Sequence, residues 1–485
     1  MSRTRWVAWL VLGAVALGAG LVLAPISPHV SAATTGDREL ANRVRAVLGD
    51  GAGYRTIHVA EITKDSVRYA GLGEIDGRTP DESTPFELGS ITKTFGGLLL
   101  ADAVSRGEVR ADGALGSYLP ELAGTPIGDV RLEELAQHRS GVPPFPPSVI
   151  VRIPLATIGN TNPYALDTPT LLQEVAGLQL MPTRGTFMYS NLGATLLGHA
   201  LARAAGEQDW RRYVAARLLG PLGMTRTTFA AARSDVPADA LVGLSDSGRR
   251  MVPWTSEAFA PAGAATWTTA ADIARYAQAV LTGTAPGPDA LAPHWNLGQD
   301  PATGLDSIGY GWFTNTVDGR RVVWHNGGTS GYRTMLAIDL DQGRAVLAVG
   351  STTRGVDALA QELLVSDPRP VGGPELPVVG LVLLVLTLLV IGVSGRAVVR
   401  GVDRLGLVTH AVEYAGLLAL VRSFGPWALV PGWCWGVLLA CAVVVLAVGL
   451  TRVVPAAAGR RRWWRWVTSG LTIVVGVVLA ALTIS

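Results

Sequence analysis

The chain has 485 residues, and its 40 basic and 38 acidic side chains nearly balance, which argues against a nucleic-acid-binding protein. Its two cysteines, Cys434 and Cys441, lie in one apolar segment, so a disulfide-stabilised fold is excluded. The mean hydropathy of +0.33 is high for a soluble protein. Apolar runs at the two ends account for this value, whereas the middle of the chain has a globular composition.

The first 33 residues predict an export signal. Arg3 and Arg5 precede an apolar run over residues 6–24, and prolines and small residues follow, as before a signal cleavage site. The apolar run is long for a signal peptide, so an uncleaved N-terminal anchor is the alternative. In both cases the arginines stay in the cytoplasm and the next segment is exported.

Residues 371–485 predict a membrane domain that starts with a short linker. Arginine clusters follow the first and third of its four apolar segments, so both clusters are expected in the cytoplasm. His410 and Glu413 in the second segment can pair on one helix face; they are functional candidates, with a structural contact as the alternative. Each segment has about the ~20 residues that a spanning helix needs. The segments cover about 376–395, 405–421, 427–450 and 466–484.

Between these apolar ends, residues 34–370 predict an exported domain of the α+β class. Residues 37–48 have the pattern of an amphipathic helix. Two paired strands are expected at 334–340 and 345–350, around a short turn. Residues 142–170 are rich in proline and polar side chains, so we expect a long loop that borders the binding cleft.

Residues 86–95, FELGSITKTF, predict a helix start that brings Ser90 and Lys93 together. Side chains three apart share a helix face, so the lysine amine can lie beside the serine hydroxyl. A hydroxyl becomes a good nucleophile when a base removes its proton, and a lysine among apolar neighbours loses its charge readily enough to act as that base. A capping serine with a surface lysine is the alternative for an isolated S-x-x-K motif.

Two further motifs follow in order, Tyr189-Ser190-Asn191 and His325-Asn326-Gly327. Together with S-x-x-K, they resemble the three catalytic elements of serine β-lactamases and penicillin-binding proteins. The Y-x-N form is similar to the branch that holds class C β-lactamases, D-Ala-D-Ala carboxypeptidases, esterases and D-aminopeptidases. The resemblance covers about residues 37–366. It implies a β-lactamase/transpeptidase-like fold, in which the active site lies between an antiparallel sheet flanked by helices and a mostly helical region.

The resemblance also implies roles for the motif residues. Ser90 would be the nucleophile that forms an acyl-enzyme, and Lys93 its base or electrostatic support. Tyr189 would act with Lys93 as general base and protonate the leaving group, since a neighbouring ammonium depresses a phenol pKa. Asn191 would orient Lys93 or a substrate amide. No metal ion and no cofactor is expected.

The third motif is expected to shape the oxyanion hole and the substrate preference. The backbone N–H groups of Ser90 and Gly328 would bind the oxyanion, and Gly327 would allow the backbones to approach. His325 stands where β-lactamases usually carry a lysine that holds the substrate carboxylate, and a histidine is only partly charged near neutral pH. This difference weakens the case for β-lactamase activity. His138 is expected to hydrogen-bond a turn at a helix end, with catalysis as the alternative.

We therefore expect a multi-pass protein of the cell membrane whose catalytic domain lies on the extracytoplasmic side. It would be a serine hydrolase acting on an ester or amide, with a small molecule or a cell-wall peptide as substrate and the lipid membrane as partner. A D-Ala-D-Ala carboxypeptidase or β-lactamase proper is one alternative, and a non-catalytic penicillin- or peptidoglycan-binding sensor is another. The sequence leaves the substrate and the oligomeric state open.

Overall fold

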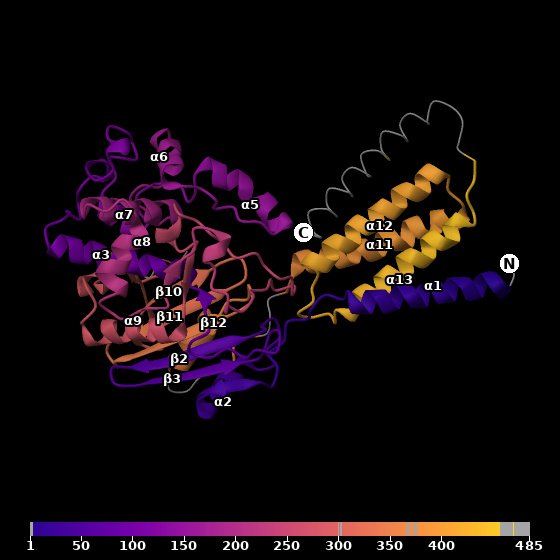
Figure 1. The fold of residues 1–485 in the computed structure, drawn as a ribbon, viewed down its shortest axis with the longest axis horizontal. Helices are drawn as coiled ribbons and strands as arrows, with labels where there is room; N and C mark the ends of the chain where they lie inside the picture. The colour runs from indigo at the N-terminus through magenta and orange to yellow at the C-terminus, as the bar shows by residue number, and fades with distance from the viewer. Residues whose placement is uncertain are drawn as a thin grey trace.

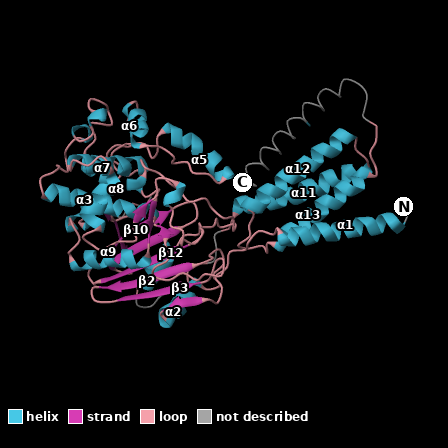
Figure 2. Ribbon diagram, in the orientation of Figure 1, coloured by secondary structure: helices cyan, strands magenta, loops and turns pink. Residues whose placement is uncertain are grey.

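A nine-stranded antiparallel sheet forms the centre of the domain between the apolar ends of the chain (Figures 1 and 2). The computed structural model describes residues 3–298, 300, 303–365, 369–372, 376–455 and 469. The strands lie in the order β1-β3-β2-β12-β11-β10-β9-β8-β7. Their bounds are β1 (Thr34–Gly36), β2 (Ile57–Thr63), β3 (Val67–Leu72), β7 (Trp295–Asn296), β8 (Ser307–Ile308), β9 (Phe313–Val317), β10 (Arg320–Gly328), β11 (Arg333–Asp339) and β12 (Arg344–Gly350).

Helices cover both faces of this sheet, which explains why its central strands are almost continuously buried. On one face, α2 (Arg38–Leu48) and α10 (Asp357–Leu364) pack into an apolar core with β2, β11 and β12. On the other face lies α9 (Ala270–Thr282), which contacts β2 and β12. The expected helix at 37–48 is confirmed: Asp37 caps α2 by accepting a hydrogen bond from the Leu40 amide at 2.9 Å. The expected strands at 334–340 and 345–350 correspond to β11 and β12.

A mostly helical region adjoins the α9 face of the sheet (Figure 1). It shares one large apolar core with that face, and a small sheet of order β4-β6-β5 joins the two parts. Its elements are β4 (Phe86–Glu87), α3 (Thr92–Ser105), α4 (Leu132–Ala136), α5 (Pro147–Gly159), α6 (Thr168–Ala176), α7 (Asn191–Ala204), α8 (Trp210–Val214), β5 (Thr228–Phe229) and β6 (Thr266–Thr268).

The expected long loop at residues 142–170 is wrong, because this segment contains the whole of α5 and the start of α6. The prediction treated its prolines as helix breakers. Pro147 instead occupies the first position of α5, where a missing N–H costs nothing and the fixed φ suits a helix. Asn160, in the left-handed conformation, ends the helix.

Long apolar helices form a bundle beside the domain that contains the nine-stranded sheet (Figure 1). Three are long and apolar enough to cross a membrane: α11 (Val378–Arg400), α12 (Arg404–Phe424) and α13 (Trp433–Leu450). They correspond to the first three predicted spans. The fourth, at 466–484, lies outside the described residues except for residue 469. At the other end of the chain, α1 (Arg3–Val22) packs along α13.

Small residues allow α1 and α13 to approach closely. A Cβ added to Gly20 would lie 2.5 Å from the Gly436 Cα, so the two backbones are in contact there. Within α12, His410 and Glu413 form the pair that their spacing predicts, with Nδ1 and Oε2 2.9 Å apart. The spacing of these two residues on one helix face is therefore enough to bring them into contact.

Two neighbouring glycines in α3 test how closely this helix packs against the backbone at Tyr310. A Cβ on Gly97 would lie 1.7 Å from the Tyr310 carbonyl oxygen, whereas a Cβ on Gly96 meets no atom within 4 Å. Gly97→Ala should therefore lower the free energy of unfolding by about 1–3 kcal/mol through overpacking. Gly96→Ala should raise it by up to about 1 kcal/mol, since alanine favours helix. Thermal melting of both variants checks this, and equal effects would contradict the packing.

Candidate active site

The Ser90 turn lies where the small sheet passes into α3. Strand β4 leads into a 3₁₀ turn at Gly89–Ile91, and α3 begins directly after it. Gly89 has a φ of +64°. The Ser90 side chain caps neither helix, so the alternative of a capping serine is not what the structure shows. Its hydroxyl is instead free to face the cleft.

Lys93 lies directly beneath the Ser90 hydroxyl. Its Nζ is 2.8 Å from Ser90 Oγ and donates a hydrogen bond to the Ala262 carbonyl at 2.7 Å. The side chain is buried, and no carboxylate within the described part of the chain forms an ion pair with it. Burial therefore holds the pKa of the Lys93 amine well below its ordinary value of 10.5. A neutral amine has a lone pair that can accept the Ser90 proton.

Tyr189 completes this cluster from the turn before α7. Its phenol lies near enough to Ser90 for the serine to lower the phenol pKa, and Lys93 Nζ lies 5.0 Å from the centre of its ring. Burial raises the pKa of the phenol above its ordinary value. This corrects the expectation of a depressed pKa, because the desolvation of the buried phenol outweighs the lowering of its pKa by Ser90. In the resting site Tyr189 is a protonated phenol.

Two histidines support Tyr189 from behind the cleft. The His138 ring lies 4.4 Å from the Tyr189 ring, and its Nδ1 accepts a hydrogen bond from the Ser190 amide at 3.2 Å. His325 is fully buried against Phe313, and its Nδ1 bonds the Asn326 carbonyl at 2.6 Å. Burial, with the nearby Lys93, lowers the pKa of His325 to about 3. The expectation of a partly charged His325 that contacts substrate is therefore corrected: its ring is neutral and lies outside the cleft lining.

Glycines bring the first and third motifs into contact. A Cβ on Gly89 would lie 2.8 Å from the Gly328 nitrogen, and one on Gly327 would lie 3.1 Å from the Ser90 nitrogen. These close approaches leave no room for side chains. The two amides that are expected to form the oxyanion hole, those of Ser90 and Gly328, therefore lie on one rim beside Ser90 Oγ.

Two connected hollows open beside Ser90. A narrow one of about 90 Å³ is lined by Tyr164, Asn191 and Phe259, and a wider one of about 510 Å³ by Phe313, Asn326 and Arg333. Ser90, Trp254 and Gly328 border both. Asn191 faces the narrow hollow without a hydrogen bond to Lys93, whose partners are Ser90 and Ala262.

The wider hollow contains a cation that sequence reasoning missed, the guanidinium of Arg333. Arg333 pairs with Gly328 across β10 and β11, and its guanidinium atoms lie 3.2–3.4 Å from where a Gly328 Cβ would stand. It donates to the carbonyls of Thr329 and Tyr332, both at 2.8 Å. Among the described residues no carboxylate forms an ion pair with it, and burial lowers its pKa. One sequence signal could have indicated it: Arg333 begins β11, the strand that pairs with the third-motif strand β10.

Glu87 ties the walls of the cleft together. Its carboxylate accepts hydrogen bonds from the Trp254 amide at 3.0 Å and from the Thr329 hydroxyl at 2.9 Å. It thereby joins β4, the Trp254 loop and the third motif. Burial raises the pKa of Glu87 from 4.5 to about 7. Within the described ranges, no three His, Cys, Asp or Glu side chains gather where they could hold a metal ion.

The Beta-lactamase family profile matches residues 43–366, which include all three motifs. The chain belongs to the beta-lactamase family. Members of this family are generally serine hydrolases. The chain is 29% identical over 334 residues to the Homo sapiens protein "Putative beta-lactamase-like 1", covering 64% of each chain. It is 24% identical over 315 residues to the "Unguisins hydrolase ungD'" of Aspergillus campestris, covering 58% of this chain and 55% of the relative. It spans less than two thirds of the length of the curated relatives it matches.

Solved structures show the same fold. The class C beta-lactamase of Rhodobacter sphaeroides aligns with a TM-score of 0.54 and 19% identity, covering 66% of this chain and 96% of that one. The D-alanine carboxypeptidase AmpC of Burkholderia cenocepacia aligns with a TM-score of 0.54 and 20% identity, covering 67% and 97%. The β-lactamase/transpeptidase-like fold expected from the motifs is therefore confirmed.

The buried Glu87 predicts a pH dependence of stability. Its pKa is about 4.5 unfolded and about 7 folded, so between these values the folded state keeps a proton that the unfolded state releases. Stability therefore falls as the pH rises through this window, by about 3 kcal/mol in all, at about 1.4 kcal/mol per pKa unit. Glu87→Gln keeps the shape and should flatten this slope. Melting temperatures at pH 5 and pH 8 in detergent check it, and equal slopes in both proteins would contradict the assignment.

Proposed function

We propose that this protein is a serine hydrolase that forms an acyl-enzyme on an ester or amide substrate. The observation that carries the proposal is the 2.8 Å contact between Ser90 Oγ and the buried Lys93 amine, whose pKa is lowered by burial. The phenol of Tyr189 completes the cluster. The amides of Ser90 and Gly328, where the first and third motifs touch, are available for the oxyanion. An intact cluster of this kind favours a hydrolase over a non-catalytic penicillin- or peptidoglycan-binding sensor.

The geometry supports a proton path through these groups. Lys93 Nζ accepts the Ser90 proton as Oγ attacks the carbonyl carbon, and the amides of Ser90 and Gly328 stabilise the oxyanion. The resulting ammonium lies close to the Tyr189 ring and favours ionisation of the phenol. The phenol gives its proton to the leaving group as the acyl-enzyme forms, and the Lys93 ammonium then returns a proton to the phenolate. A water molecule hydrolyses that ester and frees Ser90.

Arg333 favours a second candidate function, that of a D-Ala-D-Ala carboxypeptidase or a β-lactamase proper. Substrates of this type carry a carboxylate close to the reacting carbonyl, and the neutral His325 cannot pair with it. The Arg333 guanidinium lies against Gly328 in the same hollow as Ser90, so it can supply the missing cation. This cation also fits a D-amino-acid peptide with a free carboxyl end.

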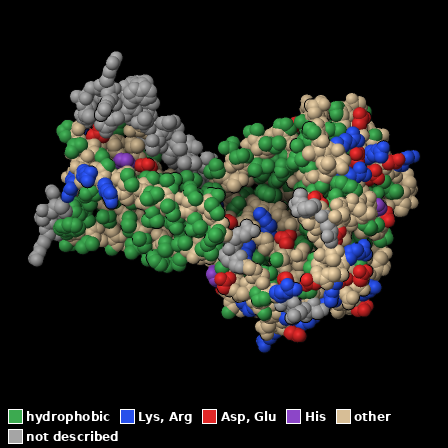
Figure 3. Space-filling view, turned by 180° about the vertical axis from the view of Figure 1, so that it is seen from behind, with side chains coloured by type: hydrophobic (Ala, Val, Ile, Leu, Met, Phe, Trp, Pro, Cys, Tyr) green, Lys and Arg blue, Asp and Glu red, His purple; other side chains and the backbone are tan. Residues whose placement is uncertain are grey.

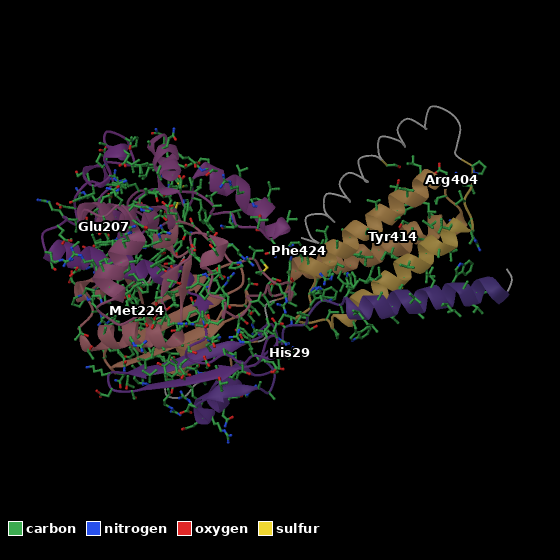
Figure 4. All side chains as sticks on the ribbon, viewed as in Figure 1. His29, Glu207, Met224, Arg404, Tyr414 and Phe424 are labelled. Atoms are coloured by element: carbon green, nitrogen blue, oxygen red, sulfur yellow. The ribbon has the colours of Figure 1, made fainter. Side chains whose placement is uncertain are left out.

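We further propose that the protein lies in the cell membrane with the catalytic domain on the extracytoplasmic side. Helices α11, α12 and α13 would span the bilayer, and α1, which packs on α13, would be a retained anchor. Figure 4 shows Arg404 at the end of the bundle away from the catalytic domain, and α11 ends nearby at Arg400. Arginines gathered at this end support a cytoplasmic position for it.

The nucleophile assignment is tested with a fluorophosphonate probe. Ser90→Ala should lose labelling and ester turnover while keeping the wild-type melting temperature, because the Ser90 side chain caps no helix. Ser105→Ala, whose exposed hydroxyl only bonds the Asp102 carbonyl, serves as the control and should label normally. Labelling that survives in Ser90→Ala would refute the assignment. Wild-type protein that is labelled but turns over no ester or amide would favour the sensor.

The role of Arg333 is tested with two matched substrates, a neutral ester and the same ester with a free carboxylate. A charge-assisted hydrogen bond contributes about 1.5–3 kcal/mol, or roughly ten- to a hundredfold in kcat/KM. Arg333→Gln should lower kcat/KM by this factor for the carboxylate substrate and change the neutral ester little. An unchanged ratio between the two substrates would remove Arg333 from substrate recognition.

The topology is tested with single cysteines in a Cys434→Ala, Cys441→Ala background. Asp50→Cys in the catalytic domain should react with a membrane-impermeant maleimide in intact cells. Arg400→Cys at the opposite end of the bundle should react only after the cells are opened. Reaction of Arg400→Cys from outside would contradict the proposed orientation.

A further inference from the structure

Helix α5 carries an apolar surface that its own domain does not cover. Among the described residues between 27 and 365, four large hydrophobic side chains are exposed. One is Val104 on α3, and the other three lie on α5: Ile150 at 52% exposed, Val151 at 69% and Leu155 at 59%. The only charged side chain of α5 is Arg152. A cluster of this kind on one short helix marks a contact surface rather than scattered surface residues.

This apolar surface adjoins the helix bundle. Arg249 donates a hydrogen bond to the Ile158 carbonyl, near the end of α5, at 2.9 Å, and its guanidinium lies 6.0 Å from the Phe424 ring centre. Phe424 ends α12 on the side of the catalytic domain (Figure 4). In Figure 3, green side chains cover the bundle and continue over the adjoining part of the catalytic domain. The end of α5 therefore lies at the level where the candidate spanning helices meet that domain.

We propose that α5 is an interfacial helix whose Ile150, Val151 and Leu155 side chains contact the lipid bilayer that α11, α12 and α13 cross. The proposal rests on the membrane topology proposed above. A bilayer fits better than a protein partner because the exposed surface continues from the bundle itself. Arg152 suits this position, since its stem can pack with apolar groups while its charge meets lipid phosphates.

The contact would set where the active site opens. Asn160, which ends α5, donates to the Arg250 carbonyl at 2.8 Å and accepts from the Val252 amide at 2.9 Å. Trp254, two residues further on, borders the cleft beside Ser90, as does Tyr164 just after α5. A helix held at the lipid surface thus fixes one wall of the cleft there. Substrates would then reach Ser90 from the membrane surface, which favours amphiphilic or membrane-attached acyl compounds.

Depth-dependent fluorescence quenching tests this contact in the full-length chain. In the Cys434→Ala, Cys441→Ala background, a fluorescent label that responds to polarity is placed at Val151→Cys and, as a second site, at Leu155→Cys. Val104→Cys serves as the solvent control, and Val385→Cys, exposed on α11, as the spanning control. Each protein is reconstituted in vesicles of phosphatidylcholine and phosphatidylglycerol. The vesicles carry a quencher either on the lipid headgroup or deep on the acyl chain.

An interfacial helix buries its apolar face about 5–10 Å into the boundary between headgroups and acyl chains. The labels at 151 and 155 should therefore shift to the blue and lose most of their fluorescence to the headgroup quencher. The label at 385 should respond mainly to the deep quencher, and the label at 104 to neither. These readouts do not depend on catalysis, so they stand apart from any failure of the hydrolase proposal.

Three other outcomes would overturn the proposal. If the 385 label is quenched and the 151 and 155 labels are not, α5 does not contact lipid although α11 spans. If the 385 label is also unquenched, the bundle does not span and the bilayer is not the partner. If the labels on α5 shift only as protein density rises, with no quenching by lipid, the surface binds a second copy of this chain.

Discussion

The active site depends on one buried amine. Lys93 has exchanged water for an apolar pocket with two hydrogen-bond partners and, among the described residues, no carboxylate in ion-pair contact, so its protonated form is disfavoured. The groups around Lys93 are arranged to use this lowered pKa. Ser90 has a base at contact distance, and Tyr189 stays a phenol until the amine takes a proton. His138 and His325 remain uncharged beside it. An acidic neighbour would keep the amine protonated and remove the base.

The backbone holds this amine in register with the rest of the site. Ser90 and Lys93 come from one turn and helix, the Ala262 carbonyl from a loop, and the oxyanion amides from two motifs that touch through glycines. Glu87 then links the floor of the cleft to two of its walls through two hydrogen bonds. The reacting groups therefore sit on rigid elements and need little rearrangement when a substrate binds.

Three motifs in order, through their resemblance to a known family, were enough to predict the fold, and helix spacing predicted the pair at its centre. The spacing of Ser90 and Lys93 is a property of one helix turn, so sequence alone placed them together. The direction of the Tyr189 pKa and the burial of His325 were not accessible in this way, because both depend on what packs around the side chain. Arg333 was missed for a related reason. It lies beside Gly328 only because of the register in which β10 pairs with β11, and the sequence does not show that register. The helix at α5 was missed because proline was taken as a breaker rather than a first residue.

The catalytic domain meets the bundle through both of its chain ends. On the N-terminal side, the Ile26 backbone in the segment after α1 packs against Gly248 of the domain. On the C-terminal side, Ser247 of the domain donates a hydrogen bond to the Ser423 carbonyl near the end of α12. These contacts hold the domain against the near end of the bundle. If the bundle is embedded, catalysis is confined to a thin layer above the lipid. A reactant that diffuses in that layer searches in two dimensions, so its surface density matters more than its bulk concentration.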